Sequence, residues 1–142
     1  MSRGRIGGRL AGAALAVAVA AVTASCEPSP EALAEDLCRD LRSFGATFEL
    51  LEAPPPGASV GEVRGALEKV APFLERLADA PQTPAPLEDE LAGVETAFRD
   101  VVDGIGDDEP ASVLVPGDVP VRLRGALAAA AGAIGCPGAP RG

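Results

Sequence analysis

Three cysteines constrain this chain more than any other feature, because two of them can close nearly all of its folded part into one loop. Cys38 and Cys136 lie near the two ends of everything that follows Cys26. An odd number of cysteines in an exported protein normally leaves one thiol that needs a separate explanation. We therefore predict a disulfide between Cys38 and Cys136 and a different role for Cys26, which directly follows a short apolar segment.

The first 25 residues have the pattern of an export signal. Arg3, Arg5 and Arg9 make a basic start, and no acidic residue occurs before Glu27. Residues 10–22 are apolar apart from one glycine. They number about 13, fewer than the roughly 20 that span a bilayer as a helix. This length is typical of the apolar core of a signal peptide, so we expect residues 1–25 to be removed.

The segment Thr23-Ala24-Ser25-Cys26 resembles the lipobox of bacterial lipoproteins, in which small residues precede the modified cysteine. Thr23 departs from the pattern, because that position usually holds Leu, Val or Ile. The resemblance implies a diacylglyceryl group on the Cys26 sulfur and a mature chain that begins there, anchored to the outer face of the cell membrane. Two acyl chains suffice for stable anchoring. Ordinary cleavage at Val22-Thr23-Ala24 is the alternative and would release a soluble secreted protein.

Net charge limits the partners of the mature protein. Loss of residues 1–25 leaves 117 of the 142 residues, enough for one domain. This loss removes three of the 12 basic residues and none of the 21 acidic ones, so the mature net charge is −12. Such a surface repels nucleic acid and anionic lipid headgroups. We expect no nucleic-acid partner, and membrane attachment only through the lipid on Cys26.

The missing residue types argue against several kinds of chemistry. The chain contains no His, Tyr, Trp or Asn. Without histidine there is no Ser-His or Cys-His nucleophile and no common zinc site. We therefore predict that the protein is not an enzyme and has no catalytic residues, no metal site and no cofactor.

Four segments carry apolar residues at the three- and four-residue spacing of a helix with one buried face. Ser29 is a suitable N-cap for the first, Ser59 and Glu62 form a capping box for the second, and Asp118 is a suitable N-cap for the fourth. Residues 126–133 are nearly all alanine, which predicts that the fourth helix is the most buried. The apolar positions of each segment form one stripe along its helix. In chain order the four stripes are Leu33, Leu37, Leu41, Phe44, Phe48 and Leu51; Val60, Val63, Leu67, Val70, Leu74 and Leu77; Leu87, Leu91, Val94, Phe98, Val101 and Ile105; and Leu123, Leu127, Ala130 and Ile134.

These segments predict an all-α fold, a four-helix up-down-up-down bundle over residues 31–137. A short tether, residues 26–30, precedes the bundle, and a tail, residues 138–142, follows it. In this topology the first helix starts where the fourth ends, so Cys38 and Cys136 can meet. Their disulfide would close a loop of about 100 residues and stabilise the fold by up to ~4.7 kcal/mol. Two buried free thiols are the alternative.

Acidic residues gather in two places, and both have a structural explanation. Glu88, Asp89 and Glu90 lie in the first turn of the third segment, where the helix dipole favours negative charge. The spacing of the second group does not match an EF-hand, so we expect a solvated loop rather than a calcium site. This second group consists of Asp100, Asp103, Asp107, Asp108 and Glu109.

These features favour a lipid-anchored module that binds another protein at the membrane face without catalysis. The alternative is a carrier that holds a small apolar ligand between its helices. The four aromatic residues would line the cavity of such a carrier, whereas in the binding module they pack in the core. They are Phe44, Phe48, Phe73 and Phe98.

The positions of Cys38 and Cys136 in a small, helical, exported chain also resemble those in secreted haemophore-like proteins of high-GC bacteria. That resemblance would imply haem binding through an axial ligand. The mature chain has no His, Tyr or Met to supply one, so we do not expect haem transfer.

Overall fold

The computed structural model describes residues 27–114 and 117–138, and their regular structure is helical apart from one isolated β-bridge. The predicted all-α class is confirmed. The predicted signal peptide, residues 1–25, and the predicted lipid site, Cys26, lie outside the described residues. In chain order the elements are α1 (Pro30–Ser43), α2 (Gly45–Glu52), α3 (Val60–Ala78), α4 (Ala85–Asp103), the 3-10 helix η1 (Ala111–Leu114) and α5 (Val119–Ile134).

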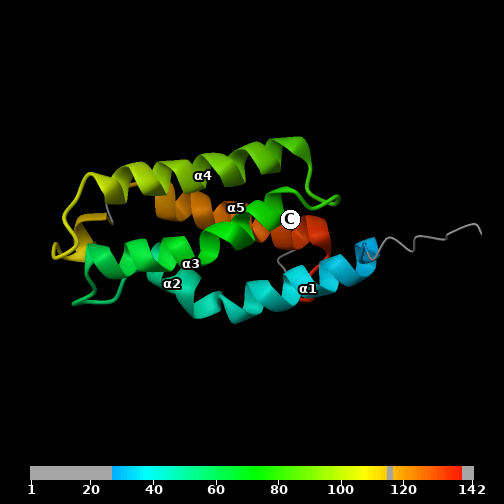
Figure 1. The fold of residues 1–142 in the computed structure, drawn as a ribbon, viewed down its shortest axis with the longest axis horizontal. Coiled ribbons are helices and arrows are strands. Elements are labelled where there is room, and N and C mark those ends of the chain that lie inside the picture. The colour runs from blue at the N-terminus through cyan, green and yellow to red at the C-terminus, as the bar shows by residue number, and fades with distance from the viewer. Residues whose placement is uncertain (1–26, 115–116, 139–142) are drawn as a thin grey trace, which may run out of the picture.

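Four of the helices form a closed ring of neighbours. α3 packs between α2 and α4, and α5 packs against α4 and α2. Figure 1 shows α3 and α5 running in one direction and α4 in the other. α1 lies beside this ring and contacts chiefly α2 and α5. We call the end with the start of α1 and the end of α5 the α1 end, and the opposite end, with residues 53–59 and 104–110, the loop end (Figure 1).

The first apolar stripe forms two helices, so the predicted count of four helices is corrected to five. α1 ends at Ser43 and α2 begins at Gly45. The Ser43 hydroxyl donates a hydrogen bond to the Asp40 carbonyl over 2.9 Å, and such a bond followed by a glycine commonly bends a helix. Phe44 still donates to the Asp40 carbonyl and Phe48 to the Phe44 carbonyl, both over 2.9 Å. The chain therefore bends at Phe44 without losing these backbone bonds.

The predicted helix starts are confirmed. The Ser29 hydroxyl accepts a hydrogen bond from the Ala32 amide over 3.2 Å. The Ser59 amide donates to the Glu62 carboxylate over 2.7 Å, and the Glu62 amide donates to the Ser59 hydroxyl over 3.2 Å, which completes the capping box. Asp118 occupies the N-cap position of α5 as predicted, but the predicted capping is corrected, because its side chain accepts no hydrogen bond from a helix amide.

The most buried helix is α3 and not, as predicted, α5. Ten of the 19 residues of α3 are buried, against seven of the 16 in α5. Ala129 and Ala133, within the alanine-rich part of α5, are exposed because α1 covers only part of this helix. None of the helices in the described part of the chain is both long and apolar enough to cross a membrane.

The third apolar stripe shifts by one residue near its end, from the predicted Val101 to Val102. Val102 is buried, whereas Val101 is 39% exposed and Ile105 is only half-buried. Val101 and Val102 follow Phe98 by three and four residues, so both lie near the same face of the helix as Phe98. The packing of α4 buries Val102 and leaves Val101 exposed. Val101 therefore points away from the core of the bundle.

Candidate functional site

The predicted disulfide between Cys38 and Cys136 is confirmed. It joins α1 to the second residue after the end of α5, with 5.4 Å between the two Cα atoms and a sequence separation of 98. Gly135 ends α5 with a left-handed φ of 83°, and the Cys136 amide donates back to the Ala131 carbonyl over 2.9 Å. This helix end directs Cys136 toward α1.

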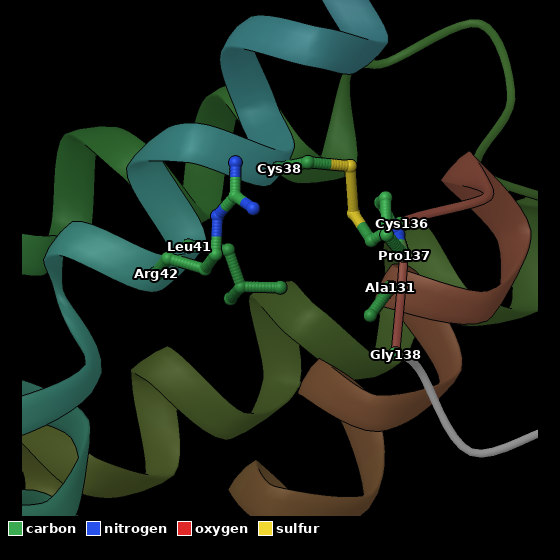
Figure 2. A pocket seen from close by; sticks show the side chains of 7 residues that line it. All are labelled: Cys38, Leu41, Arg42, Ala131, Cys136, Pro137 and Gly138. Carbon is green, nitrogen blue, oxygen red and sulfur yellow. A yellow bond between two sulfur atoms is a disulfide. The ribbon is translucent and has the colours of Figure 1, made fainter.

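Two depressions flank the disulfide, and together we call them the disulfide furrow. The first has a volume of about 210 Å³ and the second about 380 Å³. Cys38, Arg42 and Pro137 line both of them. Figure 2 shows the first depression, whose other lining residues are Leu41, Ala131, Cys136 and Gly138. The second is completed by Ala34, Glu35, Arg39, Ile134 and Gly135.

α1 has few fully buried contacts with the rest of the protein. Leu33, Ala34 and Leu41 pack partly buried against the core, and the Gln82 side-chain amide donates to the Pro30 carbonyl over 3.0 Å. Only Leu37 and Cys38 are buried among its 14 residues. Complete burial of Leu37 contributes about 1.5–3 kcal/mol. The ion pair between Asp40 and Arg76 of α3, at 2.8 Å, lies near the surface, where such pairs contribute about 0–1 kcal/mol. The disulfide is therefore a main connection between α1 and the rest of the protein.

At the loop end, residues 104–110, called the acidic loop below, dock on the first turn of α3. The Val60 amide donates to the Glu109 carbonyl over 2.8 Å, and the Gly61 amide donates to the Asp107 carbonyl over 3.0 Å. A Cβ atom at Gly61 would lie 3.2 Å from the Cβ atom of Asp107, so the glycine allows this close approach. These bonds satisfy two of the free amides at the start of α3.

Two carboxylates of the acidic group at this end pair with Arg64 of α3. Its guanidinium donates to the carbonyls of Val102 and Ile105 over 2.5 and 3.1 Å, and it pairs with the carboxylates of Asp103 and Asp107. A cation at the end of α4 also suits the helix dipole. Sequence reasoning missed Arg64, because its two carbonyl partners lie 38 and 41 residues away in the chain. Within residues 27–114 and 117–138, no group of three or more metal-ligating side chains is placed to hold an ion.

The predicted role of the other acidic run is corrected at Asp89 and Glu90. α4 begins at Ala85, so only Glu88 of the three lies in its first turn, and Glu90 pairs with α5. Glu90 accepts two hydrogen bonds from the Arg122 guanidinium, over 3.0 and 3.2 Å. These bonds lower the pKa of Glu90 and raise the pKa of Arg122. A carboxyl group with a lowered pKa stays ionised, which suits an ion pair rather than a general acid.

An apolar depression lies where α4 ends and α5 begins, and we call it the valine depression. Its volume is about 200 Å³. Val101 and Val113, which line it, are 39% and 44% exposed and are among the most exposed large apolar residues of the described part of the chain. Sequence reasoning placed Val101 in the core and left Val113 outside the four apolar segments, so it missed this surface. The lining residues are Phe98, Val101, Val113, Leu114, Gly117, Val119 and Pro120.

Three of the four aromatic rings pack against one another. The ring centroids of Phe44 and Phe73 lie 5.3 Å apart, those of Phe48 and Phe73 6.1 Å, and those of Phe44 and Phe48 6.3 Å. These are the separations of packed aromatic pairs. The three rings therefore fill the space between α2, α3 and the bend at Phe44.

Comparisons with models of known protein families, with curated proteins and with solved structures find no match to this chain. Function therefore has to be inferred from the disulfide furrow, the valine depression and the N-terminal sequence pattern.

Proposed function

We propose that this protein is exported, anchored by a lipid on Cys26 to the outer face of the cell membrane, and that it binds another protein through the valine depression without catalysing a reaction. The observation that carries this proposal is an exposed apolar depression at the loop end. Exposed apolar residues that lie together, rather than singly, are a feature that protein-binding sites share.

The position of the valine depression suits a membrane-anchored receptor or adaptor. α1 begins four residues after Cys26, so an anchor at that residue would keep the α1 end close to the membrane. The loop end lies at the opposite end of the bundle (Figure 1). A partner outside the cell could then reach the depression without competing with the lipid surface.

The surroundings of the valine depression indicate the chemistry of its partner. Its volume of about 200 Å³ is suited to one anchoring apolar side chain, the usual centre of a protein interface. Asp100 and Asp118 are exposed and directly precede the lining residues Val101 and Val119. Acidic residues next to the lining residues in the chain favour a partner with basic residues around an apolar one.

We also propose that the helices form an up-down-up-down bundle. If α1 and α2 are counted as one helix bent at Phe44, the domain has four helices that alternate in direction along the chain. The alternating directions in Figure 1 support this interpretation. It describes an up-down-up-down bundle with one bent member.

The packed aromatic rings favour the binding module over the carrier. A ligand placed among Phe44, Phe48 and Phe73 would have to displace a ring from contacts at 5.3–6.3 Å between centroids. The polar groups also fit a noncatalytic role. Thr83 is the one buried polar residue in the described part of the chain, and its hydroxyl donates to the Leu77 carbonyl over 2.7 Å.

Site-specific crosslinking in the native cell tests the proposed interface. A photoreactive residue at Val113 should capture one discrete partner, and Val101→Asp should abolish that capture. Val121→Asp is the matched control, because Val121 is 68% exposed but does not line the depression. Equal capture by both aspartate variants, or no capture at all, would contradict the proposed binding surface.

The anchor is tested separately, by the intact mass of the protein purified from its own membranes. A chain that begins at Cys26 and carries a diacylglyceryl group is the expected result. A bare chain in the medium would contradict anchoring but leave the crosslinking result at Val113 unaffected.

A further inference from the structure

The disulfide furrow separates α1 from the end of α5 on both sides of the bond. Depressions of about 210 and 380 Å³ lie on either side, and Cys38 lines both. The ring of α2, α3, α4 and α5 is closed without α1. Removal of α1 would therefore leave each of these four helices with its neighbours in the ring.

Apart from the disulfide, α1 contacts that ring mainly through partly buried or exposed groups, among them Leu33, Leu41 and the Asp40 carboxylate. Leu37 and Cys38 are its only buried residues, and one of these two is half of the disulfide. An isolated helix of about this length is marginal in water. The free α1, 14 residues long, would therefore not hold its helix on its own.

We propose that the Cys38–Cys136 disulfide is a redox latch, whose reduction releases α1 while the α2–α5 ring stays folded. The reductant is a dithiol protein of the thioredoxin-like class that acts outside the cytoplasm. One of its thiolates attacks the Cys136 sulfur, which is half-buried whereas Cys38 is buried. The Cys38 thiolate leaves, and the second thiol of the reductant breaks the mixed disulfide. Two electrons and two protons thus pass to Cys38 and Cys136, and the reductant becomes a disulfide.

Arg42 assists this exchange. It lies four residues after Cys38, one turn further along α1, and lines both depressions (Figure 2). No carboxylate of the described residues forms an ion pair with it, whereas Arg39 is paired with Asp36. A nearby cation without a carboxylate partner favours the thiolate form of a cysteine, here the leaving Cys38.

Release of α1 would change how far the bundle reaches from the membrane. The tether would grow from residues 27–29 to residues 27–43, which number 17. Extended fully, 17 residues span roughly 55–60 Å. The redox state would then set the distance of the valine depression from the bilayer. This consequence rests on the proposed anchor at Cys26, whereas the release of α1 does not.

Hydrogen exchange followed by mass spectrometry tests the latch on the exported protein, whichever cell fraction contains it. Samples are compared with the disulfide intact and after reduction with dithiothreitol and alkylation. Amides of residues 33–43 should exchange roughly tenfold faster or more after reduction, while α3, α4 and α5 keep their protection. Unchanged exchange in α1, or loss of protection in all helices, would overturn the proposal. The Cys38→Ser/Cys136→Ser double variant should show the same pattern without alkylation.

The rate of reduction by dithiothreitol tests Arg42 separately. Arg42→Gln should slow the reaction several-fold at low salt, and the difference should shrink at high salt because the effect is electrostatic. Arg99→Gln in α4 is the matched control and should leave the rate unchanged, because Arg99 does not line the disulfide furrow. Equal rates for the two variants would overturn the role of Arg42. A missing lipid at Cys26 would refute the anchor and its tether without affecting either result.

Discussion

The loop end of the bundle is held closed by hydrogen bonds and ion pairs, whereas the α1 end is held closed mainly by one covalent bond. At the loop end, the acidic loop docks on α3 through backbone bonds, and Arg64 connects α3 to the end of α4. At the α1 end, α1 buries two residues, and depressions flank the bond that connects it to α5.

This difference teaches how a small acidic protein can combine a stable bundle with a releasable helix. Hydrogen bonds that join neighbouring elements break only when those elements separate, so the loop end belongs to the cooperative core. A disulfide adds stability by limiting the unfolded chain and needs little packing around it. It is also the one connection that a chemical reaction can remove without unfolding the rest.

The largest expected effect concerns Phe48, at the boundary between the two ends. Phe48→Ala should lower the free energy of unfolding by about 3–5 kcal/mol, because it removes a buried ring from the cluster with Phe44 and Phe73. Urea denaturation measures this loss. Phe44→Ala, at a half-buried position, should lower it less. Unchanged stability with loss of a bound apolar molecule would instead support the carrier.

A smaller effect is expected from Arg64, which holds the loop end closed. Arg64→Met should lower the free energy of unfolding by about 2 kcal/mol, because two carbonyls lose a charged donor. Hydrogen exchange should become faster in the acidic loop and stay the same in α1. Arg99→Met is the control, because Arg99 pairs with Glu95 within α4, and such pairs contribute about 0.2–0.5 kcal/mol. Equal losses for the two variants would contradict the assigned role of Arg64.

Alanine substitutions at the two serine caps compare the loop end and the α1 end directly. Ser59→Ala removes the cap of α3 and should lower the free energy of unfolding by about 1 kcal/mol. Ser29→Ala removes a similar cap from α1, but it should speed hydrogen exchange in α1 with little change in global stability. If both variants lowered the urea midpoint equally, α1 would be part of the cooperative core.

The smallest expected effect is the pH dependence of the pair between Glu90 and Arg122. The pKa of Glu90 is lowered by folding, so the pair stabilises the protein above the pKa of the unfolded state, and this stabilisation is lost as the pH falls through the folded-state pKa. The urea midpoint of Glu90→Gln should therefore lie slightly below that of the natural protein at neutral pH and coincide with it in acid. Glu88→Gln, at a residue that accepts no bond from Arg122, should show no such convergence.

Local patterns predicted much of the fold correctly. The all-α class, the cap at Ser29 and the capping box at Ser59 depend on residues within four positions of one another. The disulfide between Cys38 and Cys136 was predictable for a different reason, because the order and direction of the helices bring the two residues to one end. These features need no knowledge of how side chains pack between helices.

The candidate surfaces could not be predicted in the same way. Val101 and Val102 fit one helical face almost equally well, and the packing of α4 decides which of them is exposed. The valine depression exists only because η1 and the start of α5 meet the end of α4. A search for catalytic or metal-binding motifs would not find a site made of exposed valines.

The sequence by itself determined the helical class, the cysteine pairing and the expectation of export, because each depends on residue type and spacing along the chain. The tertiary structure alone decided the bend at Phe44, the partners of Arg64 and the exposure of Val101. It also decided that α1 lies outside the ring of the other four helices. The physical reason is that spacing specifies which face of a helix is apolar, whereas burial depends on which neighbours cover that face.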